Sequence, residues 1–279
     1  MFSRAGGKRR SKRASLCSAN TPEEGVSTRC PFRRAHLPHA SSAWCSRVVY
    51  DHHAFSVPMI TLHYLNQSRA LRVWWLLEEL EVPYDVKRYQ RDETTMLAPA
   101  ELKRVHPLGK SPVIEDDGQV IAESGAIIEY LTGKYDKKGL VPPAGTPERL
   151  RYTFWLHYAE GSLMPPLLLK LVFNRLATGP SPWIVRPLLR VISRRVQESF
   201  VDPQVQLHLG YVEQELTRYR WFAGDQFTAA DIQMGFPLLV AKSQKALDDR
   251  YPHIMDFLKR MRERPAYQRA LEKSGGDEI

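Results

Sequence analysis

Residues 106–131, HPLGKSPVIEDDGQVIAESGAIIEYL, hold two groups whose types and spacing could bind a small anionic ligand. Proline has no N–H and restricts the residue before it to extended backbone, so Ser111 before Pro112 keeps its main chain free to pair with an extended ligand. Glu123 and Ser124 stand where a helix is expected to begin, and the free N–H groups of a helix start attract anions. Ser124 adds a hydroxyl donor. The sequence therefore predicts a pocket for a ligand that carries a carboxylate.

An α/β domain is expected to position these groups. Apolar runs predict strands at residues 60–64, 84–89, 113–114 and 119–122, and helical spacing predicts helices at residues 69–80, 97–105 and from residue 123. The order β-α-β-α-β-β-α is thioredoxin-like. We expect a thioredoxin-like α/β domain at residues 58–139, a linker at residues 140–147 and an all-α domain at residues 148–279.

Two segments of the helical half carry further information. In FTAADI, Thr228 and Asp231 have the spacing of a capping box, which predicts the start of a buried helix. Residues 181–200 include the apolar and basic run PWIVRPLLRVISRRV. We interpret this run as a core helix with a solvated arginine face; the alternative is a helix that makes peripheral contact with a membrane surface.

Positive charge and cysteine are concentrated at the beginning of the chain. Of 279 residues, the first 57 hold 10 Lys and Arg against 3 acidic residues, and the remainder holds 30 against 28. The nearly neutral remainder argues against nucleic-acid binding. Cys17, Cys30 and Cys45 lie in the first 57 residues, so the remainder has no cysteine for a disulfide or a nucleophile. No apolar run approaches the ~18 residues that cross a bilayer, and the scattered histidines lack metal spacing, so no metal is predicted.

Residues 1–57 lack a sustained hydrophobic period, which favours a disordered extension. Their composition also fits a mitochondrial transit peptide, and GKRRSKR fits a nuclear-import signal. A third alternative is that the protein begins at Met59. We expect a cytoplasmic protein, or a mitochondrial one if this segment is a transit peptide. We also expect a chain that starts at Met59 to keep its fold.

Several motifs resemble one family. HPLGKSP, the DDG turn and AESGAI resemble the glutathione-binding half of the glutathione S-transferases, and FTAADI resembles the capping box of their carboxy-terminal domain. The resemblance covers residues 59–273. Within the family, LHYLNQSRALR, ELKRVHPLGKSP and AEGSLMPPL are most similar to the fungal transferases typified by yeast glutathione transferase I and to their bacterial relatives. It implies the glutathione S-transferase fold, glutathione as co-substrate and a homodimer.

The resemblance also implies roles in glutathione binding. Ser111 would pair with the cysteinyl part of glutathione through its main chain, next to a cis bond at Pro112. Glu123 and Ser124 would hold the γ-glutamyl end, and Lys110 would meet the glycine carboxylate.

Other positions have weaker assignments. His106 stands where many family members have Asn, so we interpret it as a structural substitution and not as a ligand. The second substrate would lie against the helical domain, where Tyr158, Ser162 and Met164 are candidates.

Glutathione transfer needs a group that stabilises the thiolate, and the resemblance points to the end of the first strand. Ser68, at the expected start of the first helix, is our first choice for this catalytic hydroxyl. Tyr64 is the alternative of the tyrosine-type classes, and an alignment shifted by one residue points to Gln67. Asn66 and a backbone group are the remaining alternatives. The predicted function is conjugation of glutathione to hydrophobic electrophiles in detoxification, with a glutathione peroxidase activity through the same thiolate. The alternative is a non-catalytic binding or scaffold protein of the same fold.

Overall fold

The computed structural model describes residues 59–278. The expectations for residues 1–57, including the three cysteines and the targeting alternatives, lie outside the described residues.

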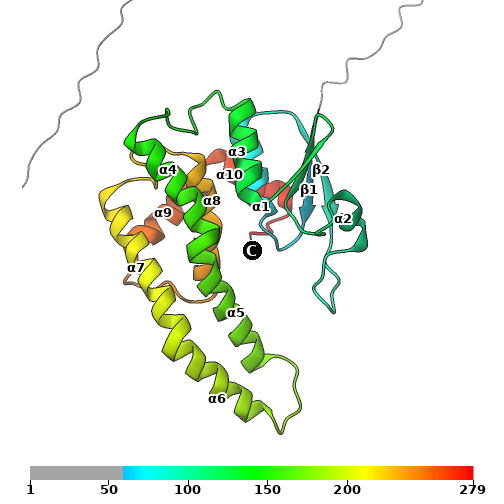
Figure 1. Cartoon of the computed structure of the whole chain (residues 1–279), viewed down its shortest axis with the longest axis vertical. Coiled ribbons are helices and arrows are strands. Elements are labelled where there is room, and N and C mark those ends of the chain that lie inside the picture. Colours follow the sequence, from blue (N-terminus) through cyan, green and yellow to red (C-terminus); the bar gives the residue numbers. More distant parts are fainter. Residues whose placement is uncertain (1–58, 279) are drawn as a thin grey trace, which may run out of the picture. The chain divides into compact units, whose positions relative to one another are not determined.

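A four-stranded mixed sheet supports the first half of the described chain. Its strands are β1 (Ile60–Leu65), β2 (Tyr84–Tyr89), β3 (Val113–Asp116) and β4 (Gln119–Ala122), in the order β2-β1-β3-β4. Strand β1 runs parallel to β2 and antiparallel to β3, which pairs with β4 through the predicted turn. Helices α1 (Ala70–Leu80), α2 (Ala100–Val105) and α3 (Ser124–Tyr135) complete the thioredoxin-like order (Figure 1).

The second half is helical, as predicted. It consists of α4 (Pro147–Tyr158), the π-helical segment η1 (Ala159–Leu163), α5 (Met164–Thr178), α6 (Arg186–Val196), a second π-helical segment η2 (Gln197–Val201), α7 (Asp202–Arg218), α8 (Ala229–Ser243), α9 (Pro252–Arg262) and α10 (Pro265–Ser274). The capping box at the start of α8 is confirmed: Asp231 accepts a hydrogen bond from the Thr228 N–H at 2.7 Å. None of the described helices is both long and apolar enough to span a bilayer.

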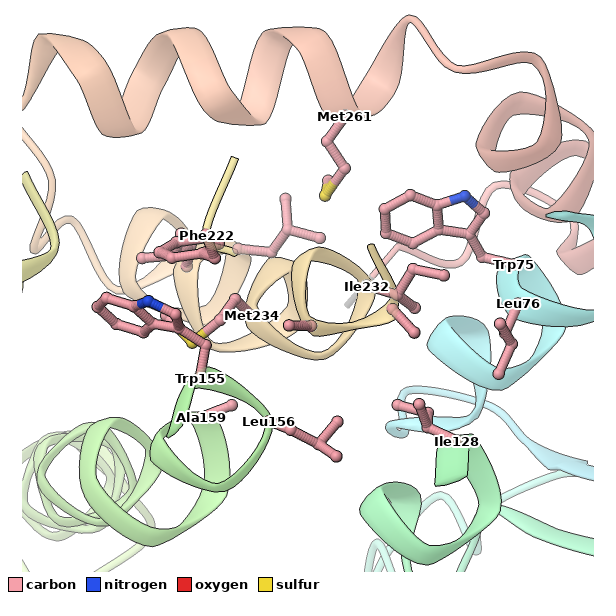
Figure 2. Close-up of a cluster of buried hydrophobic side chains, with 14 of the residues drawn as sticks. Trp75, Leu76, Ile128, Trp155, Leu156, Ala159, Phe222, Ile232, Met234 and Met261 are labelled. Atoms are coloured by element: carbon pink, nitrogen blue, oxygen red, sulfur yellow. The ribbon is translucent and has the colours of Figure 1, made fainter. Parts of the chain in front are cut away.

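Helix α1 joins the two halves. All eleven of its residues are buried, and it packs against α3, α8 and α10. Figure 2 shows Trp75 and Leu76 of α1 with Ile128 of α3, Ile232 of α8 and Met261 of α9 in one apolar cluster. The first turn of α1 therefore lies where both halves contribute to its surroundings.

The interpretation of residues 181–200 as a core helix is wrong. Within α6 only Ser193 is buried, whereas Leu188, Val191 and Ile192 are exposed. Helix α6 packs mainly against α5 and η2, which leaves much of its apolar surface in solvent.

Candidate active site

A cavity of about 720 Å³ lies between the sheet half and the helical half of the described chain. The residues that line it include Ser68, Lys110, Ser111, Pro112, Glu123 and Ser124 from the first half and Glu160 and Phe236 from the second. A cavity of this size is typical of a small-molecule site. All five residues predicted to bind glutathione therefore meet in one cavity, together with two of the four candidate thiol donors, Ser68 and Gln67.

Ser111 is anchored by its side chain. Its hydroxyl donates to the carbonyl of His63 at 2.9 Å and accepts from the N–H of Leu65 at 3.2 Å, so it fastens the end of β1 to the loop before β3. The bond between Ser111 and Pro112 is cis, as the resemblance implied. Among the described residues, none forms a main-chain hydrogen bond with the N–H or C=O of Ser111. These groups are available to an extended ligand, the role predicted for Ser111.

Glu123 and Ser124 meet the cavity at the first turn of α3. Glu123 has φ +72°, which is uncommon for a residue other than glycine and costs about 1–3 kcal/mol. Such conformations persist where the surrounding structure holds them, often at ligand sites. Ser124 is buried, and the twelve-residue helix begins there with N–H groups that have no carbonyl one turn before them. This helix start can attract a carboxylate.

The loop before Ser111 carries Lys110 and His106. Lys110 is exposed and lines the cavity, where its charge is available to an anion. His106 accepts a hydrogen bond at Nδ1 from the N–H of Leu108 at 3.4 Å, and its carbonyl accepts from the N–H of Gly109 at 2.8 Å. His106 thus shapes its own turn and also lines the cavity, so its purely structural role stays a prediction.

The hydroxyl of Ser68 has partners within the protein. It donates to the carbonyl of Leu65 at 2.6 Å and accepts from the N–H of Ala70 at 3.2 Å, and it lies 3.5 Å from the hydroxyl of Ser111. The first two contacts are local side-chain bonds of the turn before α1, whose cap residue is Arg69. Ser68 lines the cavity, so its hydroxyl can serve a bound thiolate only by exchanging the bond to Leu65.

Tyr64 is held away from the cavity. Its ring packs edge-on against Trp74, and its hydroxyl donates to the carboxylate of Asp277 at 2.9 Å. Burial and this hydrogen bond raise the pKa of the Tyr64 hydroxyl. Tyr64 is not among the residues that line the cavity, and its proton already has an acceptor.

Asp277 also reaches the turn that carries the other candidate donors. Its carboxylate accepts from the N–H of Gln67 at 2.8 Å, and Gln67 has φ +49°. Gln67 is exposed and lines the cavity. Asn66 points elsewhere, because its side-chain oxygen accepts from the N–H of Arg91 at 2.8 Å. The Arg91 guanidinium donates to the carbonyl of Gln67 at 3.1 Å and so ties this turn to the loop after β2.

The helical wall of the cavity is charged as well as aromatic. Glu160 of η1 accepts from Nε of Arg69 at 3.1 Å and from Nη1 of Arg72 at 2.7 Å, and both guanidinium groups lie over the ring of Phe236. Burial by itself raises the pKa of the Glu160 carboxyl, but the charges of Arg72 and Arg69 outweigh it, and the pKa lies below its ordinary value. Glu160 is therefore an anion that holds the first turn of α1 against the helical half.

The residues expected to meet the second substrate do not line this cavity. The Tyr158 hydroxyl contacts Nδ1 of His208 at 2.6 Å, and Met164 is buried. Ser162 is partly buried in η1. The cavity is lined instead by Arg69, Glu160 and Phe236, with Leu97 and Leu108 from the loops of the sheet half. Sequence reasoning missed these five, although Glu160 lies inside the motif AEGSLMPPL.

Comparison with known proteins gives the family. The domain described as "Glutathione S-transferase, N-terminal domain" matches residues 68–133, and "Glutathione S-transferase, C-terminal domain" matches residues 196–265. Glutathione S-transferase 3 of Schizosaccharomyces pombe is 36% identical over 215 residues, which cover 77% of this chain and 88% of the relative. The chain belongs to the glutathione S-transferase family. Glutathione S-transferase 1 of Saccharomyces cerevisiae is 32% identical, with 78% of this chain and 97% of the relative covered.

A solved structure agrees with this family assignment. A glutathione S-transferase from Actinobacillus pleuropneumoniae superposes with a TM-score of 0.64 at 35% sequence identity, covering 78% of this chain and 94% of that structure. The predicted fold class and the resemblance to fungal and bacterial transferases are both confirmed. Among residues 59–278, no group of three or more His, Cys, Asp and Glu side chains is placed to hold a metal ion, and the metal-free site stays a prediction.

Proposed function

We propose that this transferase binds glutathione in the cavity described above and adds its thiolate to hydrophobic electrophiles. The observation that carries the proposal is the meeting of Lys110, the free main chain of Ser111 and the start of α3 in one cavity. These groups suit the two carboxylates and the peptide backbone of glutathione. Lys110 takes the glycine carboxylate, Ser111 the cysteinyl main chain, and Glu123 with Ser124 the γ-glutamyl end.

The thiol is activated by a hydroxyl near the start of α1. At a reference pKa of about 8.5, only a few per cent of a free thiol is ionised at pH 7. A hydrogen bond to a charged group contributes about 1.5–3 kcal/mol, or one to two pKa units. Ser68, released from the carbonyl of Leu65, supplies this bond; the side-chain amide of Gln67 is the alternative. The thiol proton leaves to solvent, and the sulfur lone pair forms a C–S bond to the electrophile as its leaving group departs. In the peroxidase reaction the same thiolate attacks the O–O bond of a hydroperoxide, which releases the alcohol and leaves a sulfenic acid; a second glutathione then displaces water and forms the disulfide.

The electrophile binds between the sheet half and the helical wall. Leu97 and Leu108 are more than half exposed, and with Phe236 they give this side of the cavity an apolar lining. This lining supports hydrophobic acceptors. The pair of Arg69 and Glu160 lies beside Phe236 and sets the polarity of that wall. We further propose a homodimer, as is typical of the family. The partly exposed Leu150, Phe154, Leu207 and Tyr211 on α4 and α7 are its candidate contacts.

The decisive experiment is an ultraviolet titration of the thiolate of bound glutathione in the wild-type protein, Ser68→Ala, Gln67→Ala and Tyr64→Phe. We expect the bound thiol to ionise below pH 7 in the wild type and in Tyr64→Phe, and to lose this property in Ser68→Ala. Loss in Gln67→Ala alone would move the donor by one residue. Failure of the wild-type protein to bind glutathione would refute the proposal.

A second candidate is a non-catalytic binding or scaffold protein of the same family. It is favoured by one observation: the hydroxyls of Ser68 and Tyr64 both donate to acceptors within the protein. This candidate predicts glutathione binding with an unchanged thiol pKa, so the same titration separates it from the enzyme.

A further inference from the structure

The hairpin formed by α5 and α6 exposes apolar side chains at its tip. The loop between the two helices carries Trp183 and Ile184, which are 78% and 69% exposed, and Leu188 in the first turns of α6 is 59% exposed. Figure 1 shows the two helices side by side, ending in this loop. We call residues 164–196 the basic hairpin. Large apolar side chains exposed together mark an interaction surface more often than an isolated one does.

Helix α6 holds three of its four arginines on a different face from Leu188 and Ile192, whereas Arg195, seven residues after Leu188, shares the face of Leu188. Arg186, Arg190 and Arg194 follow each other at intervals of four residues and therefore share one face. Leu188 and Ile192, also four residues apart, share another, and both are exposed. Arginines on the polar face and Trp or Leu on the other are typical of helices that lie in a membrane interface.

Charge in the described chain is strongly polarised toward the basic hairpin. Residues 161–197 contain six Lys and Arg and no acidic residue, whereas residues 58–160 and 198–279 together contain 24 against 28. Lys170 pairs with Asp202 at 2.6 Å. The five arginines, Arg175, Arg186, Arg190, Arg194 and Arg195, form no ion pair with any residue in 59–278. An anionic surface would attract the hairpin and repel the rest of residues 58–279, which favours an orientation of this part of the chain with the hairpin toward that surface.

Two other occupants fit these observations less well. A second copy of the chain whose hairpin faced this one across a twofold axis would bring the arginines of both copies together without a carboxylate in the hairpin to pair with them. A nucleic acid would pair with the arginines but leave Trp183, Ile184 and Leu188 in water. A lipid bilayer offers both an anionic surface and an apolar interior.

We propose that the basic hairpin docks this transferase on the surface of an anionic phospholipid bilayer. Trp183 and Ile184 enter the interface between headgroups and acyl chains, and the arginines contact lipid phosphates and carboxylates. The cavity lies in a different part of the structure, lined by the turn before α1, the start of α3 and α8. Docking therefore leaves the glutathione site free, and it would bring the enzyme close to hydrophobic electrophiles that partition into membranes.

The test is flotation of the full chain with two kinds of vesicle, phosphatidylcholine alone and phosphatidylcholine with roughly one-third phosphatidylserine. We expect binding to the anionic vesicles only, weakened by salt. Arg190→Gln combined with Arg194→Gln is expected to weaken vesicle binding about 30-fold, because each of the two lost cations contributes a similar free energy of attraction to an anionic membrane surface. Trp183→Ser with Ile184→Ser is expected to abolish most of it.

Matched controls lie outside the hairpin. Arg218→Gln removes an exposed arginine of α7, and Val120→Ser removes an exposed apolar side chain of β4. Both are expected to keep wild-type binding. Residues 1–57 are also basic but are identical in every variant, so differences between variants report on the hairpin.

Several outcomes would overturn the proposal. Equal binding to both kinds of vesicle, no binding, or an effect of the controls as large as that of the hairpin variants would each do so. Loss of self-association in Trp183→Ser with Ile184→Ser, measured by sedimentation velocity and without vesicle binding, would assign the hairpin to a second copy. Binding to a DNA duplex that depends on the arginines, without vesicle binding, would assign it to nucleic acid.

Discussion

Helices α1 and α6 each have eleven residues, yet their side chains meet opposite environments. Every residue of α1 is buried, whereas only Ser193 of α6 is. Both sequences have apolar residues at helical spacing, and that pattern led us to expect a helix at residues 69–80 and a core helix within residues 181–200. Helix α1 is covered by α3, α8, α10 and the sheet, whereas α6 packs mainly against α5 and η2. Periodicity therefore identifies a helix, but the number of elements that pack around it decides how much of it is buried.

The charged residues of the two helices also differ in burial and in their ion pairs. Glu78 and Glu79 of α1 are buried, and each has a cationic partner from the helical half: Arg269 reaches Glu78 at 2.7 Å, and Arg264 reaches Glu79 at 2.6 Å. The arginines of α6 stay exposed and unpaired within residues 59–278. A buried charge needs a partner to offset its lost hydration, whereas an exposed one does not.

The largest expected effect is a difference between two equivalent substitutions. Leu76→Ala in α1 removes a fully buried side chain and is expected to lower the free energy of unfolding by about 2–5 kcal/mol. Leu188→Ala in α6 removes one that is 59% exposed and is expected to change it by less than about 0.5 kcal/mol. Urea unfolding of both variants measures the comparison. An equal loss in the two variants would show that α6 is covered in solution.

The second effect depends on pH. Burial by itself raises the pKa of the Glu78 carboxyl, but hydrogen bonds from Lys273, Tyr84 and Arg269 outweigh it and hold the pKa below its ordinary value. The stabilisation is therefore complete above the unfolded-state pKa and is lost as pH falls through the folded-state value. Glu78→Gln is expected to lower the free energy of unfolding at pH 7 by about 1–3 kcal/mol and to flatten its decline in acid.

Arg194→Gln in α6 is the control for this pH dependence. Helix α6 contains no carboxylate, so this substitution is expected to leave the acid limb of the stability curve unchanged. If the free energy of unfolding of Glu78→Gln fell in acid as steeply as that of the wild type, the assignment of the acid sensitivity to Glu78 of α1 would be contradicted.

A third prediction concerns ligand binding. Ser124→Ala removes a hydroxyl donor at the start of α3 and is expected to weaken glutathione binding about tenfold, because a hydrogen bond to a charged carboxylate contributes about 1.5 kcal/mol or more. Titration calorimetry measures the affinity. Arg190→Gln in α6 should leave it unchanged, since α6 does not line the cavity. Unchanged affinity in Ser124→Ala would remove Ser124 from the site.

The smallest effect is expected at Asp277, which holds the turn before α1. Asp277→Ala removes the acceptor of the Gln67 N–H and the Tyr64 hydroxyl and is expected to weaken glutathione binding about two- to fivefold. Asp277→Asn keeps one acceptor oxygen and should recover most of the affinity. If Asp277→Asn bound glutathione as weakly as Asp277→Ala, the negative charge of Asp277 would contribute more to the affinity than its hydrogen bonds.

Much of the fold and of the candidate glutathione-binding surface was predictable because it depends on neighbouring residues. The strands, the capping box of Thr228 and Asp231, and the start of α3 at Ser124 each follow from a few consecutive side chains. The partner of the Tyr64 hydroxyl was not predictable, since Asp277 is 213 residues away. Glu160 and Phe236 were missed for the same reason: they join the cavity only when the helical half packs against α1.

The sequence by itself determined the thioredoxin-like order, the helical second half and the residue types able to bind glutathione, because local propensity and spacing depend on adjacent residues alone. Tertiary structure decided which acceptors the hydroxyls of Ser68 and Tyr64 have, which helical residues line the cavity and which amphipathic helix is covered. Those outcomes depend on contacts between segments that are far apart in the chain. Burial and hydrogen bonding are shared between such segments, so no single stretch of sequence can specify them.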